Sequence, residues 1–108
     1  MDFADEETVK AYIGLAGDKP KDELISLVCK NANIIITSKL KAAKLNSNPK
    51  EIPVELTAAA NYYALQDLLS IVQINNEHND ISFLKKADLL IDEYIESHKQ
   101  LYSSFGDQ

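Results

Sequence analysis

The residues with the chemistry for catalysis or metal binding are few, and their spacing forms no site. The 108-residue chain contains a single cysteine, Cys29, and two histidines, His78 and His98. A nucleophilic cysteine needs a nearby base, and a cysteine-based zinc site needs several cysteines. No acidic residue stands three or four positions from His98, the spacing common in helical metal sites. We therefore predict a buried structural thiol, surface histidines, no metal, no cofactor and no enzymatic activity.

Three acidic residues form the most regular chemical pattern in the chain. Asp88, Asp92 and Glu96 follow one another at four-residue spacing, so they share one side of a helix. Such a row could bind a cation, but no second set of ligands accompanies it. Lys85 and Lys99 flank the row at three-residue spacing and partly offset its charge. We interpret the row as a solvated face, and the alternative is a contact surface for a partner or for a second copy of the chain.

The charges are distributed unevenly along the sequence. The formal net charge is −6, and acidic residues dominate the beginning and the last third. A basic run occupies the middle, with no acidic residue between Glu23 and Glu51, and its lysines are Lys30, Lys39, Lys41, Lys44 and Lys50. These lysines suit the end of a helix or an interface with an acidic protein. The chain lacks arginine, the side chain favoured for reading bases, so we do not expect dedicated nucleic-acid binding.

Two helices are predicted in the first half of the chain from capping residues and from apolar residues at three- and four-residue spacing. The first extends from its cap Asp5 to about Gly14. The second begins with the cap Asp18 and the first-turn Pro20 and ends near Leu45. The stretch "IIITS" within it is β-branched and could form a strand. The apolar spacing continues on both sides of this stretch, which favours a helix.

Two more helices are predicted after the loop "NSNPKEIP". Pro53 begins the third helix, whose apolar residues cover much of its circumference and indicate a central position. Tyr62 is assigned to its main apolar row and Tyr63 to the edge of that row. Asn79 or Asp80 caps the fourth helix, which carries the acidic row.

The predicted fold is a single all-α domain, residues 1–108, in which a short N-terminal helix and three longer antiparallel helices form a small bundle. We expect residues 103–108 to be a flexible tail. The beginning "MDFADEE" lacks the basic start and apolar run of a signal peptide, and the apolar runs are too short to span a bilayer. Together with the single cysteine, these features predict a soluble cytoplasmic protein that does not enter a membrane.

The segment "ETVKAYIGLAGDKPKDELISLV" resembles the tailed-phage head-tail connector (head-completion adaptor) family. Members often begin with a helix of the type E-x-V-K-x-Y-L, a turn rich in Gly and Asp, and then D-x-x-L-x-x-L-I leading into a long helix. The matching residues here are Glu7, Val9, Lys10, Tyr12, Ile13, Gly14, Gly17, Asp18, Asp22, Ile25, Leu27, Val28 and Ala32. A Pro-started third helix, P-x-x-L-x-x-A, is matched by Pro53, Leu56 and Ala59. The chain departs from the family in its short loop between the second and third helices and in its longer fourth helix.

This resemblance implies a structural function. Proteins of this family form a ring beneath the portal at the capsid vertex, where the ring extends the DNA channel and docks the tail or stopper protein. The implied partners are other copies of the chain, the portal protein, and the tail or stopper protein, and DNA passes through without sequence-specific binding. The implied location is the head-tail junction of the virion, and the host cytoplasm during assembly.

The expected interface residues belong to three groups: basic residues of the second helix, the acidic row, and apolar residues near the C-terminal end. They are Lys39, Lys41, Lys44, Asp88, Asp92, Glu96, Leu101, Tyr102 and Phe105. Two other hypotheses remain open from the sequence. One is a small cytoplasmic helical interaction module, such as a regulator or adaptor, and the other is an enzyme or nucleic-acid binder.

Overall fold

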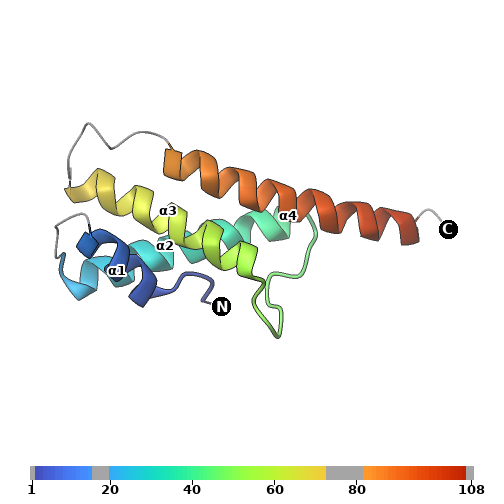
Figure 1. Cartoon of the computed structure of the whole chain (residues 1–108). Coiled ribbons are helices and arrows are strands. Elements are labelled where there is room, and N and C mark those ends of the chain that lie inside the picture. Colours follow the sequence, from blue (N-terminus) through green and yellow to red (C-terminus); the bar gives the residue numbers. More distant parts are fainter. Residues whose placement is uncertain (1, 16–19, 73–81, 107–108) are drawn as a thin grey trace.

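Four α-helices make up the part of the chain that the computed structural model describes, which is residues 2–15, 20–72 and 82–106 for the backbone and 2–15, 20–71 and 83–98 for the side chains. They are α1 (Glu6–Leu15), α2 (Asp22–Ala42), α3 (Val54–Val72) and α4 (Ser82–Gly106) (Figure 1). The prediction of a small all-α bundle is therefore confirmed.

The predicted cap of α1 is confirmed by hydrogen bonds, and α3 begins within one residue of the predicted position. The Asp5 carboxylate accepts a hydrogen bond from the Glu7 backbone N–H at 3.2 Å and another from the Thr8 hydroxyl at 2.7 Å. These bonds satisfy a free donor at the beginning of α1. Helix α3 begins directly after Pro53, whose carbonyl accepts hydrogen bonds from the backbone N–H groups of Leu56 and Thr57.

Helix α2 is shorter than predicted at both ends, and "IIITS" lies inside it as a helix. It begins at Asp22 after the extended residue Lys21, whereas Asp18 lies outside the described residues. At its end, the Lys44 N–H donates to the Lys41 carbonyl and the Leu45 N–H donates to the Leu40 carbonyl. Lys44 has a φ of 61°. This is the Schellman arrangement that ends many helices, with a lysine where glycine is usual.

Helix α3 is the central element, as predicted, because it packs against α1, α2 and α4. Ala59, Ala60 and Ala64 are fully buried, and their small side chains allow neighbouring helices to approach closely. The assignment of the two tyrosines was wrong: Tyr63 is buried and Tyr62 is only half-buried. Leu65 and Leu69, which follow Tyr62 at spacings of three and seven residues, are nevertheless buried, so the core side of α3 takes residues from both neighbouring rows.

Helix α4 extends beyond the other helices at the C-terminal end (Figure 1), and the molecule measures 54 × 26 × 18 Å. Its backbone continues through residues 103–106, which we expected to be part of a flexible tail, and residues 107–108 lie outside the described residues. Within the described residues, no helix combines the length and apolar character that crossing a bilayer requires.

Candidate protein-interaction surfaces

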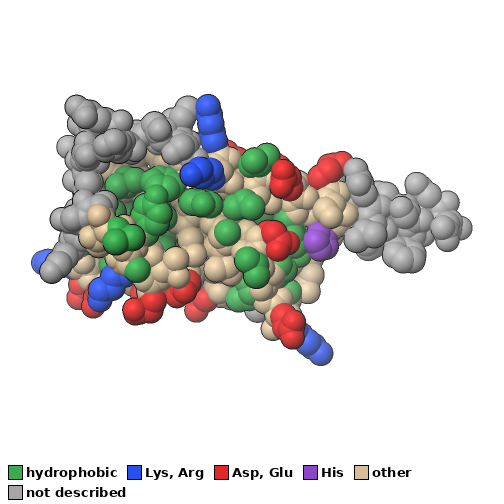
Figure 2. Space-filling model, in the orientation of Figure 1, with side chains coloured by type: hydrophobic (Ala, Val, Ile, Leu, Met, Phe, Trp, Pro, Cys, Tyr) green, Lys and Arg blue, Asp and Glu red, His purple; other side chains and the backbone are tan. Residues whose placement is uncertain are grey.

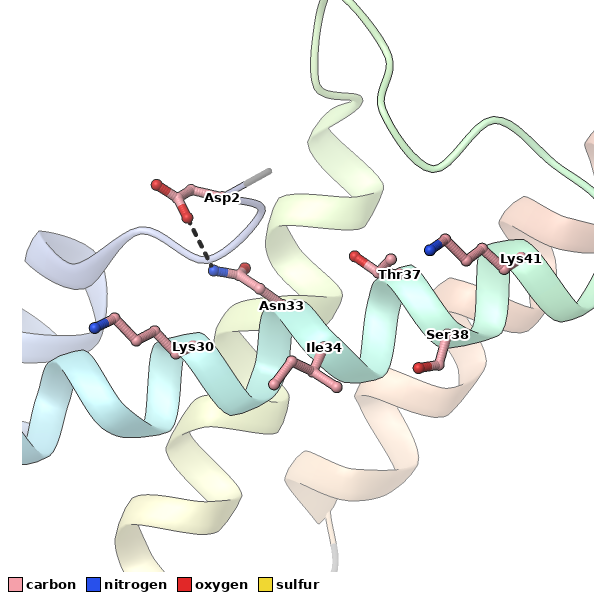
Figure 3. Close-up of a pocket in the computed structure, with 7 residues that line it drawn as sticks. All are labelled: Asp2, Lys30, Asn33, Ile34, Thr37, Ser38 and Lys41. Carbon is pink, nitrogen blue, oxygen red and sulfur yellow. Dashed lines mark hydrogen bonds between the residues drawn. The ribbon is translucent and has the colours of Figure 1, made fainter.

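A shallow groove of about 540 Å³ follows the outer side of α2 (Figure 3). We call it the α2 groove, and its lining residues are Asp2, Lys30, Asn33, Ile34, Thr37, Ser38 and Lys41. Figure 3 shows Lys30 toward one end of this stretch of helix and Lys41 toward the other, with the uncharged residues between them. The groove therefore combines two positive charges, the Asp2 carboxylate, uncharged polar side chains and one aliphatic side chain.

The helical repeat explains why this side of α2 faces outward. Val28, Ala32 and Ile36 are buried and direct one side of the helix toward the core. Leu27 and Ile34 stand seven residues apart, hence on nearly the same side of the helix, and are 50% and 62% exposed. Because the core does not cover these two aliphatic side chains, they are available for contact with another molecule.

One wall of the α2 groove is the segment before α1, and Asn33 holds it in place. The Asn33 side-chain oxygen accepts hydrogen bonds from the backbone N–H groups of Phe3 and Ala4, both at 2.8 Å, and its amide donates to the Asp2 carboxylate at 3.3 Å. The Asn61 side-chain oxygen accepts a further bond from the Asp5 N–H at 2.8 Å. Phe3 is 1% exposed. Sequence reasoning missed this attachment because it joins residues about thirty or more positions apart.

The predicted basic residues of α2 do not form one cluster. Lys41 lines the α2 groove together with Lys30. Lys44 is exposed in the Schellman turn, and Lys39 is half-buried and does not line the groove. The prediction therefore identified one of the two lysines of the groove.

The acidic row of α4 is divided between two environments. Asp88 is half-buried and accepts a hydrogen bond from the Tyr63 hydroxyl, so our interpretation of Asp88 as part of a solvated face was wrong. Burial, followed by this hydrogen bond, raises the pKa of Tyr63 above its usual value. Asp92 and Glu96 are exposed, as predicted.

Exposed acidic residues of α4 follow an exposed leucine, and two exposed lysines, Lys85 and Lys86, precede it by one turn. Leu89 is 60% exposed, and Asp92, Glu93 and Glu96 follow it at spacings of three, four and seven residues. All four lie on the same side of the helix and are exposed. We call these four residues the α4 outer face.

A third surface is aromatic and lies where α1, α3 and α4 meet. Figure 2 shows hydrophobic side chains gathered on this side of the molecule. The Phe83 ring lies edge-on to Tyr12 at 5.4 Å and stacks with Tyr62 at 5.9 Å. The Lys86 ammonium lies 5.7 Å from the centroid of the Tyr62 ring, within range of a cation–π interaction. These contacts join the three helices.

The residues considered for chemistry are in structural positions. Cys29 is buried, and burial, assisted by nearby acidic residues, raises the pKa of its thiol to about 11. His98 is half-buried, and its ring stacks on Tyr94 with the centroids 3.9 Å apart. His78 lies outside the described residues. Within the described part of the chain, no group of three or more His, Cys, Asp and Glu side chains could hold a metal ion.

The three apolar residues predicted near the C-terminal end lie in α4. Their side chains are outside the described ones, and they are Leu101, Tyr102 and Phe105. The structure therefore places their backbone on the extended part of α4, and their role in an interface stays a prediction.

Comparisons of the chain with models of protein families, with characterised proteins and with solved structures gave no match.

Proposed function

We propose that the chain is a structural subunit that acts by binding other protein chains, and specifically a head-tail connector subunit of a tailed virus or provirus. In this proposal, copies of the chain form a ring beneath the portal at the head-tail junction. The ring extends the DNA channel and docks the tail or stopper protein. The resemblance of the first two helices to the connector family supports the specific form of the proposal.

The observation that carries the proposal is the exposure of aliphatic residues on two different helices. Ile34 of α2 and Leu89 of α4 are both more exposed than buried. Single exposed aliphatic residues are common, but here each is accompanied by charged side chains. Ile34 shares its groove with Lys30, Lys41 and Asp2, and Leu89 lies between Lys85 and Lys86 on one side and Asp92 and Glu93 on the other. An apolar centre with a charged rim is the usual anatomy of a protein interface.

The net charge suits the proposed channel. DNA binds proteins largely through attraction between its phosphates and basic side chains. With a net charge of −6, a ring of this chain would give passing DNA little to adhere to. The mechanism of such a subunit consists of self-association and docking, without a chemical step.

The test combines the purified chain with the portal protein encoded in the same genome. Light scattering after size-exclusion chromatography gives the mass of each species, and negative-stain microscopy shows its shape. We expect rings, either of the chain alone or assembled on the portal. A chain that forms no ring in either condition, or a genome that encodes no portal, would contradict the proposal. A stable monomer or dimer with one other specific protein partner would instead support a helical regulator or adaptor.

A further inference from the structure

Resting on the proposed function, we infer that the α2 groove of one copy receives the α4 outer face of the next copy. The occupant of the groove is thus a second copy of this chain. The inference adds to the proposed function the two surfaces that meet when copies associate.

Complementary chemistry supports this pairing. In the α2 groove, Ile34 lies between Lys30 and Lys41 along the helix. On the α4 outer face, Leu89 is followed by Asp92 and Glu93, and Lys85 and Lys86 precede it. The acidic residues of this face can therefore approach the groove lysines, and the lysines before Leu89 can approach Asp2 at the groove wall. Bringing the two faces together removes both aliphatic side chains from water and places carboxylates beside ammonium groups.

The α4 outer face is also short enough to fit within the α2 groove. At 1.5 Å per residue, the groove from Lys30 to Lys41 extends for about 16 Å along α2. The α4 outer face from Leu89 to Glu96 extends for about 10 Å on the same basis. The acidic side chains can therefore lie between the two lysines.

The contact must form between copies because one copy cannot make it. Both α2 and α4 pack against α3, and the exposure of Ile34 and Leu89 shows that neither face is covered within the subunit. A contact between two different faces is heterologous, so each added copy leaves one groove and one α4 outer face free. Such contacts continue until the rotation between copies closes a ring.

The first test reverses the charges of each face separately. One variant carries Lys30→Glu and Lys41→Glu, and the other carries Asp92→Lys and Glu93→Lys. Because each variant has two faces of the same sign, we expect each alone to lose self-association, measured by light scattering with and without the portal. Mixed in equal amounts, the two variants should assemble in alternation, because each groove then meets a face of opposite sign.

A matched variant controls for the change in net charge. Lys21→Glu with Lys50→Glu changes the same number of exposed lysines outside the groove and should assemble like the wild type. Far-UV circular dichroism checks that all variants keep their helices. If both reversed variants assemble as well as the wild type, whether alone or in the presence of the portal, the inference is overturned and the proposed function stands. If the wild type assembles in neither condition, both are overturned.

A second test locates the contact without changing charge. A chain with Ile34→Cys is mixed with a chain with Leu89→Cys under mild oxidation, and we expect a disulfide-linked dimer of the two. The native Cys29 does not compete because it is buried with a raised thiol pKa. Val54→Cys, at another exposed aliphatic position, replaces Leu89→Cys as the control. Equal cross-linking of the control, or none at the predicted pair in assembled protein, would overturn the inference.

Discussion

Replacement of Asn33 by alanine should destabilise the fold by a predictable amount, because this side chain holds the segment before α1. The Asn33 oxygen accepts two backbone hydrogen bonds of 2.8 Å, from Phe3 and Ala4. Each contributes about 1 kcal/mol net, so their loss costs about 2 kcal/mol. Alanine favours the helix over asparagine by roughly 0.5 kcal/mol, which leaves a net loss of about 1.5 kcal/mol. Partial exposure of the Phe3 ring, which the segment buries, would increase this loss.

Asn31 provides a matched control on the same helix. Its side chain is exposed and makes one long contact of 3.5 Å with Asp67, which contributes little. Asn31→Ala gains the same helix propensity, so the difference between the two alanine variants isolates the attachment and should be about 2 kcal/mol. Asn33→Asp keeps the oxygen that accepts the two bonds but places a second carboxylate beside Asp2, and should be intermediate.

The assay for all three variants is equilibrium urea unfolding followed by far-UV circular dichroism. The free energy of unfolding, extrapolated to water, should decrease in the order Asn31→Ala, Asn33→Asp, Asn33→Ala. If Asn33→Ala is as stable as Asn31→Ala, the two hydrogen bonds do not stabilise the fold and the reasoning is refuted.

Three further predictions concern the same unfolding measurement. Tyr63→Phe removes the hydrogen bond to Asp88 and should lower the free energy of unfolding by about 1 kcal/mol. Because the pKa of Tyr63 is raised in the folded state, the stability of the wild type should be constant below the unfolded pKa of about 10 and decrease as the pH rises above it. This decrease should be steeper than in the variant, which lacks the titrating hydroxyl. Lys44→Gly should stabilise the protein by about 0.5 kcal/mol, since Lys44 has a φ of 61° that glycine adopts without strain, and a loss of stability would contradict this account of the turn. Leu68→Ala should lower the free energy of unfolding by about 2–5 kcal/mol because Leu68 is fully buried. The control Leu27→Ala, on the exposed side of α2, should change it by less than about 0.5 kcal/mol.

The helices were predictable because their signals are local. The Asp5 cap and the position of Pro53 depend on neighbouring residues, and the structure confirms both. The β-branched stretch "IIITS" was resolved as a helix by apolar residues on either side of it. Such signals act within one or two turns, so one sequence is sufficient to recognise them.

The sides of the helices that face the core were less predictable. Helix α3 carries two adjacent apolar rows, and only packing against α2 and α4 decides that Tyr63 rather than Tyr62 is buried. The burial of Tyr63 also brings its hydroxyl to Asp88 and removes Asp88 from the solvated face. The attachment of Phe3 by Asn33 depends likewise on tertiary contact, because nothing in the local sequence of either residue indicates the other.

The attachment of the N-terminal segment bears on the proposed contact between copies, because it places a carboxylate in a groove that is otherwise basic. Asp2 lines the α2 groove and is held there by Asn33, so it would attract Lys85 and Lys86, which precede Leu89 on the next copy. Asp2→Asn keeps the shape of the wall and removes the attraction, which between exposed charges contributes about 0.5 kcal/mol. We therefore expect this variant to associate roughly twofold more weakly, measured by sedimentation at several concentrations, with the difference decreasing at high salt. Tighter association of Asp2→Asn at low salt would show that these lysines of α4 do not approach the wall of this groove.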